Sequence, residues 1–598
     1  MRIRSVLLLP LFLSSFVFSG EALWPLNALP LEEIEKDWKF KPDEKWIKHV
    51  QQATARVAMK DMPGGGSGAF VSPDGLLVTN RHCIDDMLAA LSTPERNILR
   101  DGFYANSRDL ELETGMEICV LREMLNVTDK VVKDLRGNLS SAAIARLRRQ
   151  VEERPPEPGV ALKLVPLFAG HEFWLYVYDV YPAKLVFAPD EALGAFGGEE
   201  DNFRYPRHKL DIAFLRAYKD GEPLKTPYFA LAAKGPKEGD QVFVAGSPGM
   251  TERYLPLARI EFLREKQLPL QVATGNGAVA AIQKFMNQGA EQRRIGSVTL
   301  GQYANELKIN QGALDFFKRP EFIAARKKQE EQWREKIAAS PEAAKIASTA
   351  FADIESACVV LGKTAAARHF QEMPSGRFWG LAQSLLNFSN ATRGKQDAQI
   401  AAMAESFSEF VDKILDPAGG VHIDVERDVL AAWLGAAKEH LPADHRFLKL
   451  ALNGTSPEES ARTLLSGAER LTKPEAVKEL VSRGFESIDE AKLPILKFVS
   501  ELKKLEDADA AQASEAQKKC DTAIAALERA RACVRKVSGA QRHGHAAPGL
   551  GRRERLRREG QEDSIAYDVR LDAVARRRSA RESAVRTVEE VPRCAVQL

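Results

Sequence analysis

The chain has 598 residues, more than a single hydrophobic core organises, so we expect at least two domains. Apolar residues make up 44% and charged residues 28% of the chain, a balance that excludes a disordered or a membrane-embedded protein. The 85 Lys and Arg residues nearly cancel the 83 Asp and Glu residues, so overall charge gives no reason to expect a nucleic-acid partner.

The N-terminus has the pattern of a secretory signal peptide. Arg2 and Arg4 precede an apolar run over residues 6–18, and two small residues follow it. This run is shorter than the roughly 20 residues that cross a bilayer, and no later segment is long and uncharged enough to do so. We therefore expect removal of residues 1–20 and export of a soluble protein to the periplasm or the extracellular space.

Short apolar runs broken by Gly, Pro and Asp indicate a β-rich domain over residues 21–258. A hairpin is predicted over residues 69–79, where the turn Ser72-Pro73-Asp74-Gly75 joins two apolar strands. Residues 184–187 and 241–245 are predicted to be buried strands. An Arg- and Ala-rich stretch, 135–151, is interpreted as a helical insertion.

Residues 259–536 are predicted to form an all-α domain, because Ala, Glu, Lys and Leu recur there at helical spacing. Two helix starts are marked by a capping serine before a proline, at Ser340 and Ser456. One predicted helix has an apolar face formed by Phe351, Ile354, Cys358 and Leu361.

The last stretch, residues 537–598, differs from both regions. Lysine is absent after Lys536, Arg clusters appear, and apolar periodicity is lost. One interpretation is a basic arm that binds an acidic partner such as a nucleic acid or an anionic lipid. The interpretation that we favour is a shift of the coding frame near Lys536, which makes this tail aberrant.

The residues that indicate chemistry are a histidine and an aspartate. His82 follows the Gly-rich hairpin directly, as the general base does in two-barrel serine proteases. Asp211 starts a later apolar strand and could fix the tautomer of His82, although it could also merely cap that strand. No Cys-x-x-Cys pair or His-Glu-x-x-His helix occurs, so a zinc site has little support. Nucleophilic catalysis by a serine and a histidine needs no metal or organic cofactor, so none is expected.

A Gly-rich run with aromatic and charged residues, 194–208, has the composition of a binding loop. With these motifs the chain resembles the bacterial serine dipeptidyl-peptidase family that includes dipeptidyl-peptidases 7 and 11. The family has a closely similar mature start, here residues 21–25, a Thr-Asn-His-His-Cys run at His82, and a Gly-Gly-Asp-x-Asp-Asn-Trp-x-Trp-Pro-Arg-His loop followed by Asp-Phe-Ser. The resemblance covers residues 22–536.

The resemblance implies a chymotrypsin-like double β-barrel interrupted by a large all-α domain that covers the cleft. It also implies release of dipeptides from oligopeptides with a free N-terminus, and it suggests a homodimer. By this resemblance His82 is the catalytic base, Asp211 orients it, and Asn202 and Phe203 lie at the site for the substrate α-amino group. Phe203 stands where the family has a Trp.

Two further departures lie beside the histidine. Gly66 replaces a family Cys, so Cys83 lacks its expected disulfide partner. Arg81 replaces the first His of the family pair.

The nucleophilic serine has no match in this chain. The family carries Gly-Asn-Ser-Gly-Ser-Pro near its C-terminus, and nothing after Asp211 resembles it. Ser247 matches a family turn that is not catalytic. Read one base later, the codons for residues 581–594 could encode a sequence that resembles the family shortly before its serine. We therefore expect an incomplete second barrel and an inactive chain, and a non-catalytic exported peptide-binding protein as the alternative.

Overall fold

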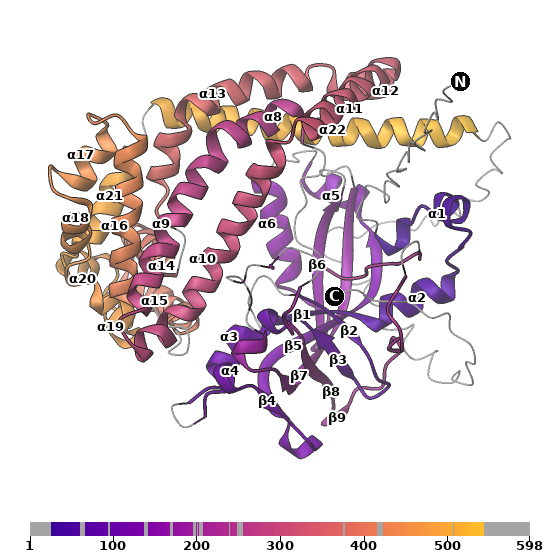
Figure 1. Cartoon of the computed structure of the whole chain (residues 1–598), viewed down its shortest axis with the longest axis horizontal. Helices are drawn as coiled ribbons and strands as arrows, with labels where there is room; N and C mark the ends of the chain where they lie inside the picture. The colour runs from indigo at the N-terminus through magenta and orange to yellow at the C-terminus, as the bar shows by residue number, and fades with distance from the viewer. Residues whose placement is uncertain are drawn as a thin grey trace, which may run out of the picture.

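The chain folds into a β-rich region and a large helical region (Figure 1). The structure is a computed structural model that describes residues 25–59, 66–93, 96–136, 141–167, 172–194, 196, 199, 201–202, 207–237, 240–247, 255–374, 377–415, 422–505 and 508–542. The predicted signal peptide and residues 543–598 of the Arg-rich tail lie outside the described residues.

A closed antiparallel β-barrel forms the centre of the β-rich region. Its strands follow the order β7-β5-β1-β2-β3-β8, and β8 pairs back onto β7 to close it. They are β1 (Thr54–Met59), β2 (Gly66–Phe70), β3 (Leu76–Thr79), β5 (Leu112–Asn126), β7 (Glu172–Ala188) and β8 (Ala213–Lys219). The short β4 (Phe103–Tyr104) and β9 (Glu222–Pro223) pair with β7 and β8. Closure leaves these six strands without a free edge, which makes the barrel a rigid support for side chains at its rim.

The predicted hairpin is confirmed as β2 and β3. Gly75 takes φ +69° in the turn, a backbone conformation that favours glycine. Gly68 on β2 lies against Leu77 of β3, and a Cβ at Gly68 would come within 2.5 Å of that side chain. The barrel interior is filled by side chains that include Ala55, Val57, Phe70, Leu77, Ile118, Leu185 and Leu215.

One of the two predicted strands is confirmed and the other is wrong. Residues 184–187 lie within β7, but residues 241–245 form no strand. Val242 and Val244 are 37% and 71% exposed, whereas Phe243 packs against Trp46. A strand needs a hydrogen-bonded neighbour, and residues 241–245 have none among the strand pairs that the structure describes.

The strands β5 and β7 extend beyond the barrel into an arm with its own small core. There β6 (Val160–Leu167) pairs with β7, and two helices, α5 (Thr128–Asp134) and α6 (Ser141–Glu152), pack on the arm. The predicted helical insertion at 135–151 is therefore present mainly as α6.

Smaller helices surround the barrel. They are α1 (Leu31–Trp38), α2 (Glu44–Ala53), α3 (Asp85–Ala90), α4 (Ile98–Asp101), α7 (Glu191–Gly194) and the 3-10 turns Leu26–Ala28, Arg81–Ile84 and Arg108–Leu110. Helix α2 leads directly into β1 and buries Trp46, Val50 and Ala53 against the barrel.

The helical region occupies the left and the top of Figure 1. Its helices are α8 (Leu257–Phe262), α9 (Leu268–Met286), α10 (Ala290–Phe317), α11 (Pro320–Ala339), α12 (Pro341–Ala347), α13 (Ala350–Gln371), α14 (Arg377–Thr392), α15 (Asp397–Ile414), α16 (Ile423–His440), α17 (Arg446–Leu452), α18 (Pro457–Leu464), α19 (Pro474–Val481), α20 (Phe485–Glu490), α21 (Pro494–Lys504) and α22 (Ala508–Arg542). A π-helical turn, Leu263–Gln267, joins α8 to α9, and a 3-10 turn, Ala468–Thr472, precedes α19.

The sequence expectations for this region agree with its packing. The hydroxyls of Ser340 and Ser456 accept hydrogen bonds from the backbone N–H of Ala343 and Glu459, which caps α12 and α18. The predicted apolar face of α13 is buried against α22 and α8. Helix α22 continues past Lys536 to Arg542. Of the helices in the described part of the chain, none is both long and apolar enough to cross a membrane.

Candidate active site at the barrel rim

His82 lies at the rim of the barrel because strand β3 ends just before it. The chain leaves β3 at Thr79 and turns into the 3-10 helix Arg81–Ile84, which carries His82. Asp211 immediately precedes β8, and β8 pairs with β3 so that Thr79 lies opposite Ala213. The pairing of two distant strands therefore brings the two predicted residues together, although 129 positions separate them in the sequence.

The carboxylate of Asp211 holds His82 from two directions. Its Oδ2 lies 2.7 Å from His82 Nδ1, and its Oδ1 accepts a hydrogen bond of 3.0 Å from the His82 backbone N–H. Asn80 donates from Nδ2 to the Asp211 carbonyl oxygen at 3.1 Å. The Asp211 side chain is only 4% exposed, while that of His82 is 35% exposed. Nδ1 is thus committed to the carboxylate, and Nε2 is the ring nitrogen left for proton exchange with a substrate or a nucleophile.

The surroundings favour the charged forms of both residues. Burial lowers the pKa of His82, but the hydrogen bond to Asp211 and the interaction with Cys83 outweigh it and raise this pKa to about 10. Burial raises the pKa of Asp211, but the hydrogen bond from His82 and the nearby Arg207 lower it below its ordinary value. The site therefore stabilises an imidazolium beside a carboxylate, the charge state that forms when the imidazole takes up a proton.

Arg81, which precedes the histidine, is almost fully buried. Its side chain is 1% exposed and donates to the carbonyl oxygens of Pro189 and Leu99 at 3.2 Å and 2.7 Å. It also pairs with Asp85 at 2.7 Å. Burial raises the pKa of Asp85 to about 6, even though Arg81 acts in the opposite direction. Arg81 thus anchors the turn that carries His82 to three neighbouring segments.

Gly66 and Cys83 face each other across the barrel rim. A Cβ placed on Gly66 would lie 2.5 Å from Cys83 Sγ and 3.2 Å from Cys83 Cβ. Cys83 is a free thiol in the structure. The space beside Cys83 is therefore suited to a second sulfur once the two residues shift slightly.

We expect the substitution Gly66→Cys to create a disulfide with Cys83. Closing a loop of this length should stabilise the oxidised protein by about 3 kcal/mol relative to the reduced one. Thiol counting and thermal unfolding with and without reductant measure both effects, and Gly235→Cys, where an added Cβ meets nothing within 4 Å, is the matched control. Two free thiols at positions 66 and 83 under oxidising conditions would contradict the expectation.

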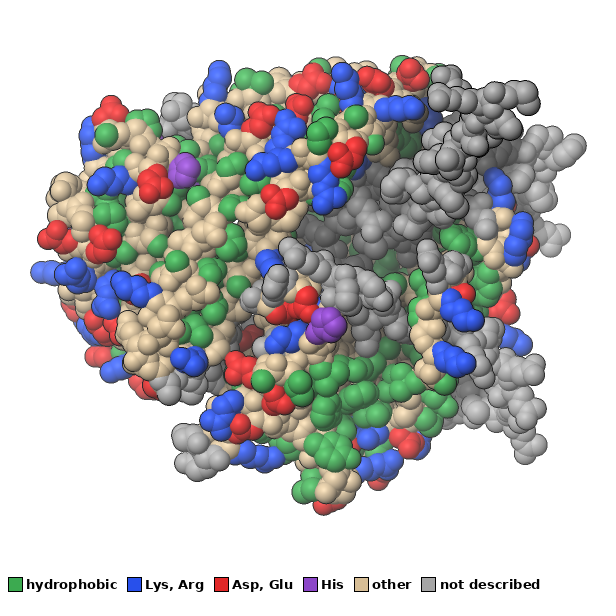
Figure 2. All heavy atoms as spheres, in the orientation of Figure 1, with side chains coloured by type: hydrophobic (Ala, Val, Ile, Leu, Met, Phe, Trp, Pro, Cys, Tyr) green, Lys and Arg blue, Asp and Glu red, His purple; other side chains and the backbone are tan. Residues whose placement is uncertain are grey.

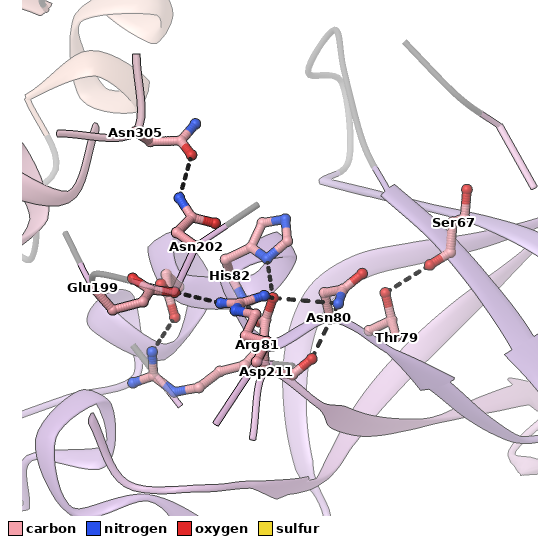
Figure 3. A network of polar contacts seen from close by, with 11 residues as sticks. Ser67, Thr79, Asn80, Arg81, His82, Glu199, Asn202, Asp211 and Asn305 are labelled. Atoms are coloured by element: carbon pink, nitrogen blue, oxygen red, sulfur yellow. Dashed lines mark hydrogen bonds and ion pairs between the residues drawn. The ribbon is translucent and has the colours of Figure 1, made fainter. Parts of the chain in front are cut away.

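Asn202 is buried between the barrel rim and the helical region. The residue is only 2% exposed, and its Nδ2 donates a hydrogen bond of 3.2 Å to Asn305 Oδ1 of α10. Figure 3 shows the side chains of Asn305 and Asn202 pointing toward each other, with His82 beside Asn202. Sequence reasoning missed Asn305, because no local motif marks a residue 103 positions away. Phe203, the other predicted residue of this site, lies outside the described residues.

Two more residues of the loop contact the histidine pair. The ring of Phe196 stacks on the ring of His82, with the centroids 4.3 Å apart and the planes inclined by 25°. Arg207 Cζ lies 4.9 Å from the centre of the Phe196 ring. The same guanidinium pairs with Glu199 at 2.5 Å and approaches Asp211 Oδ2 at 3.5 Å. The composition of the loop indicated a binding segment, but only the folded chain identifies these contacts.

Ser247 lies beside Ser67, to which its backbone N–H donates at 2.7 Å. Thr79 also hydrogen bonds to Ser67, and Figure 3 shows Ser67 on the far side of Thr79 and Asn80 from His82. That Ser247 is not the nucleophile stays a prediction. Among the residues that the structure describes, no group of three or more His, Cys, Asp and Glu side chains could hold a metal ion.

A barrel that presents a histidine hydrogen bonded to a buried aspartate at its rim has the framework of a hydrolase of the peptidase class. The chain belongs to the peptidase S46 family, whose model matches residues 19–546. The sequence resemblance to the dipeptidyl-peptidase 7 and 11 family is thereby confirmed.

Curated relatives carry dipeptidyl-peptidase names. Dipeptidyl-peptidase 7 of Porphyromonas gingivalis is 27% identical over 473 residues, which are 74% of this chain and 64% of the relative. Dipeptidyl-peptidase 7 of Capnocytophaga gingivalis is 29% identical over 51% of this chain and 46% of the relative. The Asp/Glu-specific dipeptidyl-peptidase of Shewanella putrefaciens is 28% identical over 68% of this chain and 58% of the relative. The matched parts therefore span less than two thirds of the length of each of these relatives.

A solved structure shares the fold. The crystal structure of Porphyromonas endodontalis DPP11 in complex with the dipeptide Arg-Glu matches with a TM-score of 0.62 and 21% identity, over 83% of this chain and 73% of that chain. At this identity the likeness establishes the architecture of a β-barrel with a large helical portion.

Proposed function

We propose that this chain derives from an exported serine-type dipeptidyl peptidase and lacks the nucleophilic serine. The observation that carries the proposal is the hydrogen bond of 2.7 Å between His82 Nδ1 and the buried carboxylate of Asp211. The dipeptidyl-peptidase names of the relatives and the dipeptide in the related crystal structure support the reaction type. Residues 1–20 have the signal-peptide pattern that supports export.

The contacts of His82 and Asp211 support a role for each residue in acyl transfer. His82 Nε2 takes the proton of the serine hydroxyl as its oxygen attacks the scissile carbonyl, and later gives that proton to the leaving amine. Asp211 keeps the proton of the neutral imidazole on Nδ1 and stabilises the imidazolium that forms. Asn202, with Phe203 next to it, binds the free α-amino group of the peptide, since an amide oxygen accepts hydrogen bonds from an ammonium.

The position of Asn202 supports the restriction to dipeptides. It belongs to the loop that contacts His82 through Phe196, and Asn305 holds it from α10 of the helical region. An ammonium site at a fixed, short distance from the base permits only a short N-terminal fragment to be released. Oligopeptides with a free N-terminus are therefore the proposed substrates.

The exposed apolar residues after β9 support a missing second barrel. Residues 241–245 alternate as a strand does, with Phe243 on the Phe40 and Trp46 side and Val244 on the exposed side. Leu231 is 77% exposed, and Figure 2 shows hydrophobic side chains gathered on the visible face of the barrel. In a chymotrypsin-like double barrel these residues would pair with strands of the second barrel, which the shifted frame after Lys536 removes.

Restoring the frame after codon 536 tests the proposal. The printed chain should not hydrolyse a fluorogenic dipeptidyl reporter, whereas the restored chain should, and an N-acetylated reporter should stay intact in both. In the restored chain, His82→Ala should lower the rate by at least about 10⁴-fold. His440→Ala, a substitution of an exposed histidine at the end of α16 in the helical region, is the matched control and should retain activity.

Three outcomes would contradict the proposal. Activity of the restored chain that survives His82→Ala removes the assigned base. A gene that reads without a shift across codon 536 removes the frameshift account. Calorimetric binding of oligopeptides without turnover in the restored chain favours the non-catalytic peptide-binding protein instead.

A further inference from the structure

The stacking of Phe196 on His82 is a contact that the proposed acid–base chemistry does not use. The two rings lie nearly parallel at 4.3 Å between centroids, within the range of attractive aromatic stacking. The imidazole of His82 is also held by Asp211 at Nδ1. One face and one edge of the imidazole are thus fixed by two different segments of the chain.

Helix α10 sets the position of the segment that carries Phe196. Gly301, Asn305 and Lys308 are spaced four and three residues apart, so they share one face of this helix. A Cβ on Gly301 would lie 3.2 Å from the Phe196 carbonyl oxygen, which shows how closely the backbone approaches the helix. Asn305 accepts a hydrogen bond from Asn202, and Lys308 donates one to the Glu199 carbonyl oxygen.

Arg207 supports the same ring from the barrel side. Its guanidinium packs on the Phe196 ring at 4.9 Å and is itself held by Glu199 at 2.5 Å. Because it also approaches Asp211 at 3.5 Å, it links the ring to the carboxylate that orients His82. Phe196 therefore lies in a network that joins α10, the loop and the histidine pair.

We propose that Phe196 is a positioning residue that holds the imidazole of His82 against Asp211, and that the Gly301, Asn305 and Lys308 face of α10 sets its place. Stacking restricts rotation of the imidazole about its side-chain bonds and keeps Nδ1 on the carboxylate. The π face of the ring also favours the imidazolium over the neutral imidazole. The consequence for catalysis rests on the proposed function, but the contact and its effect on His82 do not.

The other charged groups around His82 contribute to its proton affinity as well. Asp211, Cys83 and Asp85 interact with it electrostatically, and Arg207 acts on Asp211. Substitution of Phe196 alone keeps all of these charged groups, although Arg207 loses its contact with the ring. A change in the titration of His82 on substituting Phe196 therefore reports the loss of the ring, directly and through Arg207.

The experiment is a histidine NMR titration of the printed chain labelled with ¹³C-histidine. One of the 10 histidines is assigned to His82 by comparison with His82→Ala. In Phe196→Leu, loss of the ring current should move the His82 ring protons downfield, and the pKa of His82 should fall by about 0.5. Phe196→Tyr should preserve both values. Phe316→Leu, at an exposed position of the same helix α10, is the control.

A second variant guards against misfolding of the first. Gly301→Ala retains both rings but pushes on the Phe196 carbonyl, so it should move the His82 signals in the same direction by a smaller amount. Unchanged His82 shifts and pKa in both Phe196→Leu and Gly301→Ala would overturn the proposal. These measurements need no turnover, so they remain interpretable even if the chain proves not to derive from a peptidase. A negative NMR result, in turn, would not contradict the peptidase proposal.

Discussion

Replacing Asp211 by asparagine should strongly lower the pKa of His82. The substitution removes the negative charge at 2.7 Å from Nδ1 while it keeps the size of the side chain. Burial, which lowers the pKa of His82, is then opposed only by the weaker remaining interactions. The pKa of His82 should fall from about 10 to near or below its ordinary value of 6.5.

The same substitution should abolish most of the activity of a chain whose serine is restored. Asparagine can hold the imidazole in the wrong tautomer, with its lone pair turned away from the serine, and this costs about 10⁴-fold in kcat. NMR titration of His82 and hydrolysis of a dipeptidyl reporter measure the two effects. Asp109→Asn, a substitution of an exposed carboxylate in the 3-10 turn Arg108–Leu110, is the control and should change neither. A normal rate in Asp211→Asn would contradict the role assigned to Asp211.

The stability of the protein should depend on pH with a definite sign. The pKa of His82 is higher in the folded chain, at about 10, than the value of 6.5 expected when it is unfolded. The folded state therefore binds more protons between these values, so this contribution to stability is complete below pH 6.5 and is lost as the pH rises toward 10. In Asp211→Asn this part of the pH dependence should disappear, as thermal unfolding over pH 6 to 10 would measure.

Replacing Arg81 by methionine should strongly destabilise the barrel rim. The guanidinium is buried and satisfies two backbone carbonyl oxygens and Asp85. Methionine has a similar length but leaves the Asp85 carboxylate without its ion-pair partner. Burial already raises the pKa of this carboxylate, so its charge is costly there. Removing one partner of such a buried pair costs about 3–5 kcal/mol.

Urea unfolding of the barrel measures this loss, and two comparisons identify its origin. Arg81→Met combined with Asp85→Asn should recover part of it, because the unpaired charge is then gone. Arg100→Met, where the guanidinium is exposed beside Asp101, should have little effect. Arg81→Met should also gain stability as the pH falls through the raised pKa of Asp85, because protonation removes the buried charge. An Arg81→Met protein as stable as its parent would show that the anchor is dispensable.

Features with a short-range signal could be predicted from the sequence. The hairpin before His82 has a turn of defined residue types flanked by apolar residues, and the caps of α12 and α18 need only a serine and the backbone a few residues later. The apolar face of α13 follows from helical periodicity. The order of His82 and Asp211 in the chain and the family resemblance predict that they form a pair, and the two side chains are in contact in the structure.

The error at residues 241–245 has a clear physical reason. Their alternation and β-branched residues favour a strand, but a strand forms only where another chain segment offers its backbone hydrogen bonds. Local pattern reports the preference of the segment and carries no information about its partner. Val244 is exposed because the described part of the chain offers this strand-like segment no partner strand.

The sequence alone singled out His82 and Asp211 as candidate acid–base residues and located the change from the β-rich region to helices, because both depend on side-chain type and on neighbours along the chain. Only the tertiary structure decided what surrounds His82. The β3–β8 pairing supplies Asp211, the loop supplies the ring of Phe196, and α10 supplies Asn305. All three contacts join residues more than 100 positions apart, and such pairings arise from closure of the barrel and packing of the helices rather than from any local pattern.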